Sequence, residues 1–588
     1  AFPGAEGPGS TATGGRGGDV YHVTNLNFDK DGVTPGSLKY GINTAPAAGR
    51  TIVFDVGGTI FHDGGGSNWW VRSGKSNLTI AAQTAPGGVT IAGVGSKFTG
   101  DNLVVRNLAV RPNQDPINPT SFTYDGLATQ ATNSIFDHMS VTWFTDEGIS
   151  ATDAVNNTTI QYALIGEGLN YNGHSYGSII NTQNNDAPLS YHHNLYAHNS
   201  SRNPRLGSET GTGAIANFSN NVIYNWSSRA GYSALNTDTG AQEPSRTNFL
   251  NNFYARGANR GSTIFSSAGD ATQIYQSGNL YDGVQDGDFD DAVAVTWANF
   301  SGVETQASTP FPVEAGFVES ATAARDRVLD YAGANWWNRT STDARIVASV
   351  RTGDGRIINS VPAEEWDDLL AAPLVSRDAD WDVDRDGMPD AWEIRHGLDP
   401  LVDDHNGDFD ADGYLNLEEY LNELAAWPAP KPLEFNPSQS NRFAESGNWE
   451  LAWQPSRFDQ ARIVSGDAIV DAVGQSVGAI DIAPDTGQTA RLVVSQGALE
   501  VVGEIRIAES GADGRLVLSG GALRTGALTN GHGGSFEFTG GTLSADIVAF
   551  DLTNAGGVLS PGDHVGVAPG ARIGATMVTG DLTLQAGS

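Results

Sequence analysis

The feature that most limits the fold of this chain is a short phrase that recurs through residues 1–370. Each copy consists of an apolar strand, a polar residue and a second strand, as in LVVRNLAVRP, IFDHMSVTW, SYHHNLYAH and FSNNVIYNW. Asn194, Asn221, Asn252 and Asn279 follow one another at intervals of 27, 31 and 27 residues. Repeats of about 20 to 50 residues are typical of solenoids, propellers and arrays.

The repeated phrases alternate like strands and show little helical periodicity. Stacked rungs of this kind bury their apolar faces only against their neighbours. We therefore predict an all-β chain in which residues 1–370 form a right-handed parallel β-helix, with the repeated asparagines in a ladder at one turn. An array of β-sandwiches is the alternative, but irregular rung lengths and long inserted loops favour the β-helix.

Two further regions differ from the first. Residues 376–425 are strongly acidic, and residues 426–435, with Pro428 to Pro432, predict a stiff linker. Residues 436–588 contain a second set of repeats, RLVVSQGALE, RLVLSGGALR and SFEFTGGTLS. They loosely resemble the β-strand repeats associated with autotransporter-type and surface-associated bacterial proteins, which implies a second, smaller C-terminal β-solenoid and no activity.

Charge and composition narrow the possible partners and the location. The formal net charge is −35, which makes nucleic acid a poor partner. The chain has no cysteine, so it has neither a disulfide framework nor a cysteine-based metal site. It begins at Ala1 without a methionine and has no run of about 18 apolar residues that could span a membrane. We expect a monomer that is secreted or associated with a bacterial cell surface.

Two segments of the acidic region match the twelve-residue calcium loop of EF-hand proteins position by position. In that loop, oxygen-bearing side chains occupy positions 1, 3, 5 and 9, glycine position 6 and glutamate position 12. Ca²⁺ prefers roughly six to eight oxygen ligands, which such a loop supplies. A solvated acidic linker is the alternative. We predict an EF-hand-like module whose calcium is structural, with the ligands Asp382, Asp384, Asp386, Asp390 and Glu393 in the first loop and Asp408, Asp410, Asp412, Asn416 and Glu419 in the second.

Three segments of the first region resemble the pectate lyases of polysaccharide lyase family one. They are the opening AFPGAEGPGS, the segment IFDHMSVTWFTDEGIS, and SYHHNLYAHNSSRNPRLG with its HHN and RxPR patterns. The resemblance covers roughly residues 1–285. It implies β-elimination on a uronate polymer, in which a base removes the proton alpha to the uronate carboxylate. Calcium bound to that carboxylate acts as a Lewis acid.

The resemblance also implies roles for individual residues. Arg202 matches the family's proton-abstracting arginine, and Arg205 matches an arginine that binds a substrate carboxylate. Asp125 and Asp146 match two calcium ligands, and Glu147 is a neighbouring candidate. Because a guanidinium is normally always charged, Arg202 can act as a base only if its surroundings lower its proton affinity.

The sequence departs from the family pattern at three positions. The family's third calcium carboxylate falls on Ser150, and its second substrate-binding arginine falls on Gly207. Its substrate-binding lysine has no counterpart, although His174 and Tyr176 lie in that stretch and are candidate substrate-binding residues. These departures leave the number of catalytic calcium ions and the identity of the polysaccharide open.

Asp137 and His138 could be taken for an acid and base pair. Adjacent strand residues point to opposite faces of a sheet, so we expect them not to act together on one substrate. His138, His192 and His193 are interpreted as packing or ladder residues of their rungs.

The leading prediction is a secreted, calcium-dependent, endo-acting lyase that cleaves polygalacturonate with an arginine base. A β-helix lyase for another uronate polymer is the first alternative. A β-helix glycoside hydrolase would need carboxylates on both sides of the scissile bond and would leave Arg202 unexplained. A non-catalytic, calcium-binding surface or adhesin protein is the last alternative, because a fold alone does not imply chemistry.

Overall fold

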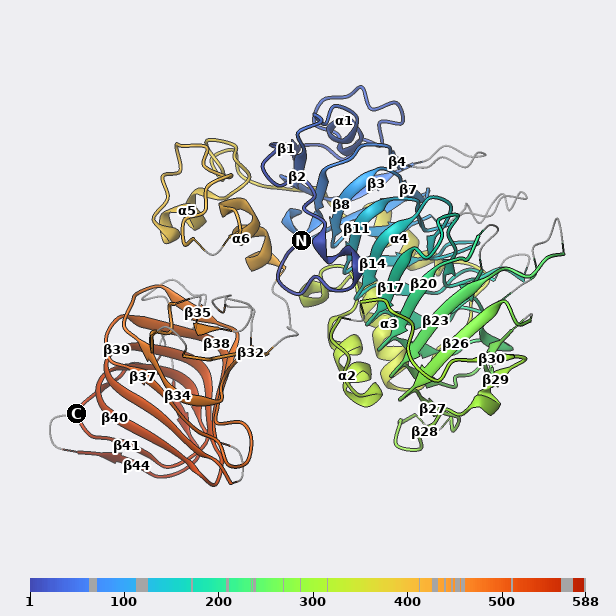
Figure 1. The fold of residues 1–588 in the computed structure, drawn as a ribbon. Coiled ribbons are helices and arrows are strands. Elements are labelled where there is room, and N and C mark those ends of the chain that lie inside the picture. The colour runs from blue at the N-terminus through green and yellow to red at the C-terminus, as the bar shows by residue number, and fades with distance from the viewer. Residues whose placement is uncertain are drawn as a thin grey trace. The chain divides into compact units, whose positions relative to one another are not determined.

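The computed structural model divides the chain into two compact units, one holding residues 1–409 and 415–425 and the other residues 410–414 and 426–588. Figure 1 shows the fold of both units. The structure describes all residues except 63–70, 113–124, 171–172, 208–210, 234, 236–239, 268, 286, 315, 412, 426–431, 438–439, 446–447, 450–454, 456–459, 509–510, 562–574 and 586–588.

The first unit is built from three long sheets, in each of which the strands are hydrogen-bonded to one another in sequence. The first sheet runs from β1 (Asp19–Val23) through β2 (Arg50–Phe54), β5 (Leu78–Ala81), β8 (Asp101–Arg106), β11 (Thr132–Asp137), β14 (Asn156–Gln161), β17 (Pro188–His192), β20 (Ile215–Ser219), β23 (Ser245–Leu250) and β26 (Thr272–Ser277) to β30 (Thr305–Gln306). The second runs from β4 (Val71–Ser73) through β7 (Ser96–Phe98), β10 (Leu127–Thr129), β13 (Ile149–Ala151), β16 (Ile179–Ile180), β19 (Arg205–Leu206), β22 (Arg229–Ser233) and β25 (Thr263–Ser266) to β29 (Phe300–Ser301). The third runs from β31 (Val375–Ser376) through β3 (Val56–Phe61), β6 (Val89–Ala92), β9 (Ala109–Arg111), β12 (Ser140–Thr142), β15 (Leu164–Gly166), β18 (Leu195–Ala197), β21 (Val222–Tyr224), β24 (Phe253–Ala255) and β27 (Leu280–Asp282) to β28 (Val293–Ala294).

From β2 to β27, strands that follow one another in the chain lie in different sheets, and each pairs with the strand one rung away. Phe136 of β11, for example, pairs in parallel with Val105 of β8 and with Ile160 of β14. The chain therefore winds through the three sheets once per rung. This topology confirms the predicted parallel β-helix.

A buried asparagine ladder runs along the corner between the first and third sheets. The Nδ2 atoms of Asn194, Asn221 and Asn252 each donate to the Oδ1 atom of the next asparagine, at 3.0, 3.1 and 2.9 Å, and the ladder ends at Asn279. These bonds satisfy polar groups that would otherwise be costly to bury. The predicted ladder is confirmed.

The expectation that Asp137 and His138 point apart is wrong. His138 has a φ of 51°, so the chain turns in the left-handed region at this corner and the alternation of a strand is broken. The Nδ1 atom of His138 lies 2.9 Å from Oδ1 of Asp137. Both side chains are buried, and the ring of His138 stacks on Tyr162, which stacks in turn on His193. His138 and His193 are thus packing residues, as predicted.

Helices cover part of the third sheet. The described helices are α1 (Leu38–Asn43), α2 (Ala321–Tyr331), α3 (Ser341–Arg351), α4 (Ala363–Ala371), α5 (Asp390–His396) and α6 (Asn416–Leu424), with the described 3₁₀ turns η1 (Pro8–Thr11), η2 (Ala82–Thr84), η4 (Trp297–Asn299) and η5 (Trp336–Asn338). Val328 of α2 and Ile346 of α3 pack against the outward apolar residues Leu164, Leu195 and Val222. Among the described helices, none is both long and apolar enough to cross a membrane.

The acidic segment that carries the calcium loops packs on the first sheet. Met388, Trp392 and Tyr420 form one buried apolar cluster with Val53 of β2 and Ala81 of β5. Burial of large apolar side chains contributes roughly 1.5–3 kcal/mol each, which fixes α5 and α6 on the β-helix. Except for residues 410–414, the segment thus belongs to the same compact unit as the β-helix.

The second unit is a smaller solenoid of parallel strands. Leu492, Leu516 and Phe536 occupy equivalent positions on successive rungs and pair in register. Its apolar side chains form one buried cluster of their own. The strands are β32 (Pro432–Glu434), β33 (Gln460–Ile463), β34 (Ser465–Val470), β35 (Gln475–Val477), β36 (Ala479–Ile482), β37 (Thr489–Val494), β38 (Ala498–Ile507), β39 (Asp513–Asn530), β40 (Gly534–Val548), β41 (Leu552–Asn554), β42 (Val558–Leu559), β43 (Met577–Val578) and β44 (Leu582–Leu584). Most of the predicted linker, 426–431, lies outside the described residues, and its last residues form β32.

Candidate active site and calcium loops

The residues that carry the family resemblance gather at one end of the second sheet. Asp125 lies just before β10, Asp146 and Glu147 just before β13, and Arg202 just before β19. Parallel strands of consecutive rungs begin at the same edge of the sheet, so residues in these loops are stacked above one another. The rung geometry thus brings together residues that lie on different rungs and far apart in the sequence.

Three carboxylates form a cluster at this edge. One oxygen from each of Asp125, Asp146 and Glu147 lies within 4.8 Å of the others. Burial, with the nearby carboxylate of Asp146, raises the pKa of Asp125 to about 7. Crowded, partly buried carboxylates favour binding of a hard divalent cation, because it relieves their repulsion. The donor set therefore fits calcium.

Arg202 lies against this cluster. Its Nη1 atom forms a short ion pair with Oε1 of Glu147, and its Nε atom donates to the hydroxyl of Tyr232 at 3.0 Å. Its guanidinium lies 3.9 Å from the ring centroid of Tyr176. The Arg202 side chain is 20% exposed, so it is held in place yet can be reached from solvent.

The predicted residues Tyr176 and His174 are also brought to the site. Tyr176 is bonded as a parallel bridge between Glu147 and Ser201, which places it on the rung between the cluster and Arg202. The Nε2 atom of His174 lies 3.8 Å from Oδ1 of Asp146, and its ring meets the edge of Tyr176. Both side chains are therefore near enough to contact a polymer bound along these strand ends.

Arg205 has a partner that the sequence analysis missed. Its Nη2 atom donates to Oε2 of Glu243 at 2.8 Å, and Glu243 is 3% exposed. A Cβ atom added at Gly207 would lie 2.0 Å from the same Oε2 atom. The glutamate thus fills the space beside position 207, where the family pattern has an arginine. Glu243 lies 38 residues from Arg205 in a stretch without a motif, so no spacing signal could have found it.

Ser150 does not join the carboxylate cluster. Its Oγ atom accepts a hydrogen bond from the backbone N–H of Ile179 at 3.0 Å, which ties β13 to β16. At the position of the family's third calcium carboxylate, this protein thus has a serine that links two neighbouring strands.

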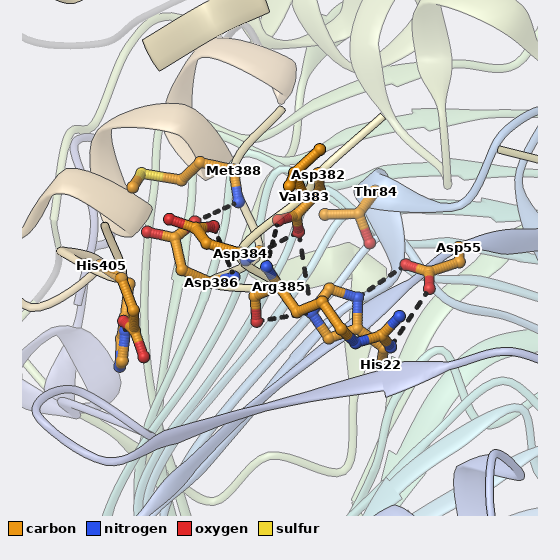
Figure 2. A network of polar contacts seen from close by, with 12 residues as sticks. His22, Asp55, Thr84, Asp382, Val383, Asp384, Arg385, Asp386, Met388 and His405 are labelled. Carbon is orange, nitrogen blue, oxygen red and sulfur yellow. Dashed lines mark hydrogen bonds and ion pairs between the residues drawn. The ribbon is translucent and has the colours of Figure 1, made fainter. Parts of the chain in front are cut away.

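The first calcium loop contains a second set of converging carboxylates (Figure 2). Oxygens of Asp382, Asp384 and Asp386 lie within 4.8 Å of one another, and Asp386 forms a similar group with Glu393 and Asp404. Burial, with neighbouring carboxylates, raises the pKa of Asp386 to about 7 and that of Glu393 to about 8. These raised pKa values have the same physical origin as that of Asp125, so this donor set also fits calcium.

The side chains at position 9 of both loops each accept a hydrogen bond from the backbone of their own loop. The Asp390 side chain accepts a hydrogen bond from the N–H of Val383 at 2.9 Å, and Asn416 accepts one from the N–H of Phe409 at 2.9 Å. Among the described residues, Asp390 belongs to none of the converging groups. Each of these side chains closes its own loop.

The remaining second-loop residues are only partly described. Glu419 lies on α6 and Asp408 is exposed in the loop before it. Asp410 is exposed, and Asp412 lies outside the described residues.

The first calcium loop is fastened to the start of the β-helix. Figure 2 shows His22 between the two parts. Its Nδ1 atom lies 2.8 Å from Oδ1 of Asp55, and its Nε2 atom lies 3.0 Å from the carbonyl oxygen of Arg385 and 3.7 Å from Oδ2 of Asp382. His22 is on β1, so residues 363 positions apart are joined at this point.

The chain combines a parallel β-helix with an arginine set against clustered carboxylates at one end of a sheet, and its relatives identify it as a polysaccharide lyase. No family model matches the chain. It is 35% identical over 430 residues to "Probable pectate lyase C" of Aspergillus flavus, a match that covers 72% of this chain and 94% of the relative. The protein of the same name from Aspergillus fumigatus strain CBS 144.89 is 34% identical over 430 residues, covering 72% and 93%. The chain belongs to the pectate lyase family.

Solved structures with a similar fold are more distant. The major allergen of cedar pollen is 17% identical with a TM-score of 0.42, covering 56% of this chain and 92% of that one. A pectate lyase from Bacillus sp. N165, solved in complex with trigalacturonate, is 14% identical with a TM-score of 0.38, covering 57% and 99%.

The match to the fungal relatives extends further than the recognised motifs. A continuous stretch that covers 72% of a 588-residue chain must include about residues 170–420, wherever it begins. The relatives therefore align with the calcium-loop segment as well as with the Arg202 region. They are Aspergillus proteins, so they give no support to the expected bacterial origin, and an adhesin or a hydrolase no longer explains the chain.

Proposed function

We propose that this protein is a calcium-dependent pectate lyase that cleaves polygalacturonate by β-elimination, with Arg202 as the base. The observation that carries the proposal is the position of Arg202, partly exposed and in contact with Glu147 of the carboxylate cluster. A base and a cation site must face the same sugar for this reaction, and the stacked strand ends satisfy that requirement.

Asp125 and Asp146, with Glu147 beside them, would hold the catalytic calcium. When bound, calcium supplies Lewis-acid stabilisation of the negative charge that develops on the uronate carboxylate. The carboxylate oxygens of the cluster leave part of the cation's coordination to substrate and water, because calcium takes more oxygens than these side chains offer.

Arg202 takes the proton from the carbon alpha to the uronate carboxylate. The C–H bond breaks, its electrons form the C=C double bond, and the glycosidic oxygen leaves with its bonding pair and takes a proton from water. The ring of Tyr176 and the hydroxyl of Tyr232 hold the guanidinium in place. Arg202 must be neutral to accept the proton, and exclusion of water by bound polymer disfavours its charged form.

Substrate contacts are assigned to Arg205, His174 and Tyr176. Arg205 presents a fork of donors that can bind a carboxylate in two-point fashion, while Glu243 fixes its orientation. His174 and Tyr176 lie beside the carboxylate cluster. A polymer along the strand ends would contact all three.

We further propose that both EF-hand-like loops bind structural calcium. In the first loop the ligands include Asp382, Asp384, Asp386 and Glu393, and in the second Asp408, Asp410, Asp412 and Glu419. A polymeric substrate cannot cross a membrane unaided, so the proposal places the enzyme outside the cell, as a secreted or surface-bound monomer.

The test is ultraviolet absorbance of polygalacturonate incubated with the protein, first with calcium and then with excess chelator. A calcium-dependent rise reports the unsaturated product and supports the proposal. The Arg202→Ala protein should give no rise while keeping its circular dichroism spectrum. Activity retained by Arg202→Ala would remove the arginine-base assignment.

A lyase for another uronate polymer is the second candidate, and one observation favours it. Glu243 places a negative charge where the family pattern has a positive one, which disfavours a uronate carboxylate at that subsite. Absence of turnover on polygalacturonate, together with turnover on alginate or a glycosaminoglycan, would decide for this candidate.

A further inference from the structure

One carboxylate near the first calcium loop lies outside the sequence pattern. Asp404 belongs to the segment between the two loops, yet its carboxylate oxygen lies within 4.8 Å of oxygens of Asp386 and Glu393. An acidic cluster alone does not make a metal site, so the state of its members decides whether this one binds an ion.

The surroundings of Glu393 indicate that this cluster binds an ion. Its residue is 0% exposed, and among the described residues neither Oε1 nor Oε2 has a hydrogen-bond partner. A buried carboxylate without partners is strongly disfavoured unless a cation compensates its charge. The groups that converge on Glu393 are the carboxylates of Asp386 and Asp404, so a cation between them would compensate the charge of Glu393.

Asp404 is also held in position by neighbouring groups. Its backbone N–H donates to Oδ2 of Asp386 at 3.2 Å. The Nδ2 atom of Asn416 donates to the carbonyl oxygen of Asp404 at 3.0 Å and to its Oδ1 atom at 2.9 Å. Asn416 is position 9 of the second loop, so that loop fixes the orientation of a carboxylate at the first.

Asp390 is occupied elsewhere. It accepts the N–H of Val383 and stands apart from the converging oxygens of the described residues. We propose that Asp404 is a direct calcium ligand of the first loop, in the place that the EF-hand pattern gives to Asp390, and that Asn416 couples the two loops through it. The inference rests on the proposed structural calcium.

The neighbouring group of Asp386, Asp403 and His405 is the competing arrangement. Calcium prefers oxygen ligands, whereas His405 offers a nitrogen. The His405 ring is already used, since Nδ1 contacts Asp403 and Nε2 lies 3.1 Å from the carbonyl oxygen of Gly18. Calcium therefore favours the side of Asp386 that holds Glu393 and Asp404.

The experiment compares Asp404→Asn with Asp390→Asn in the full chain. Asparagine keeps the hydrogen-bond acceptor in both cases but removes the charge that calcium needs. Asp399→Asn is the matched control, since Asp399 is exposed in the same segment and lies outside the cluster. Calcium affinity and stoichiometry are measured by titration calorimetry.

Asp404→Asn should weaken one calcium site about tenfold or more, because ligand charge sets affinity in such loops. Asp390→Asn and Asp399→Asn should stay within about twofold of wild type. Melting in excess chelator should be the same for all three variants, which separates a lost ligand from a damaged fold. Weakening by Asp390→Asn with wild-type affinity for Asp404→Asn would overturn the inference.

Two further variants keep this inference separate from the proposal on which it rests. If Glu393→Gln leaves calcium stoichiometry unchanged, the loop does not bind calcium and the structural-calcium proposal fails. If Glu393→Gln removes one ion but Asp404→Asn does not weaken binding, only the inference fails. Asn416→Ala should weaken the first loop as well, whereas Asp408→Asn should leave the first loop unchanged, because Asp408 is a proposed ligand of the second.

Discussion

The two carboxylate clusters of the first unit are built from the same kinds of side chain but differ in exposure and in partners. At the active-site edge, Asp146 is 22% exposed and Glu147 shares its charge with Arg202. In the calcium loop, Glu393 is fully buried and has no partner among the described residues. An open cluster leaves coordination positions for substrate, whereas a closed one can only fasten the protein to an ion.

The two clusters also differ in how the chain assembles them. Asp125, Asp146 and Arg202 come from three rungs and meet only because the rungs stack in register. Most of the loop cluster comes from one twelve-residue segment, with Asp404 added from nearby. The first cluster thus depends on the whole β-helix, and the second on local backbone geometry.

The largest effect should follow from loss of the base. Arg202→Ala should lower kcat about a thousandfold, the scale expected for removal of a general base, with calcium stoichiometry unchanged. Initial rates of product absorbance check this. Arg246→Ala, an arginine of β23 in the first sheet paired with Asp186, is the control and should remain active. A kcat of the Arg202→Ala protein near the wild-type value would show that the cluster works without this arginine.

The next effect separates the open cluster from the closed one. Asp125→Asn should lower kcat/KM at least about tenfold at low calcium, equivalent to about 1.4 kcal/mol of transition-state stabilisation, and excess calcium should restore part of it. In excess chelator its Tm should not fall, because no bound ion is then lost and Asp125 lies outside the apolar core. A lower Tm with normal turnover would mean that the open cluster is structural.

The reverse pattern is expected for the closed cluster. Glu393→Gln should lower the Tm by about 2–4 °C in calcium, as loss of a bound ion requires. In chelator it should not lower the Tm, because it removes an uncompensated buried charge. The turnover of the folded enzyme should stay within a factor of about two. Differential scanning calorimetry with parallel rate measurements checks both. Loss of activity at an unchanged Tm would instead connect the loop to catalysis.

The smallest effect concerns the contact between Arg205 and Glu243. Glu243→Gln removes the charge that neutralises Arg205, and should lower KM for polygalacturonate about threefold with kcat unchanged. On a polymer with fewer carboxylates, the same substitution should lower KM by a smaller factor. A raised KM would show that Glu243 positions Arg205 more than it opposes the substrate.

The repeating parts of the fold could be predicted from the sequence, whereas contacts made by residues outside the repeats could not. Asn194 and Asn221 recur at rung spacing, so the ladder and the β-helix could be predicted. The contact of His138 with Asp137 depends on a left-handed corner that alternation rules do not anticipate. Glu243 and Asp404 lie in irregular segments, where only the folded structure brings them to their partners.

The attachment of the calcium segment has a consequence for how the protein matures. Strand β31, just before that segment, pairs with β3 and covers the end of the third sheet, while His22 of β1 contacts the first loop. Exposed sheet edges can pair with strands of other chains. Strand β31, which covers β3, is synthesised about 320 residues after it. In calcium-poor surroundings the newly made protein should therefore be prone to aggregation. In calcium-rich surroundings it should resist aggregation. Light scattering during refolding with and without calcium would reveal the difference.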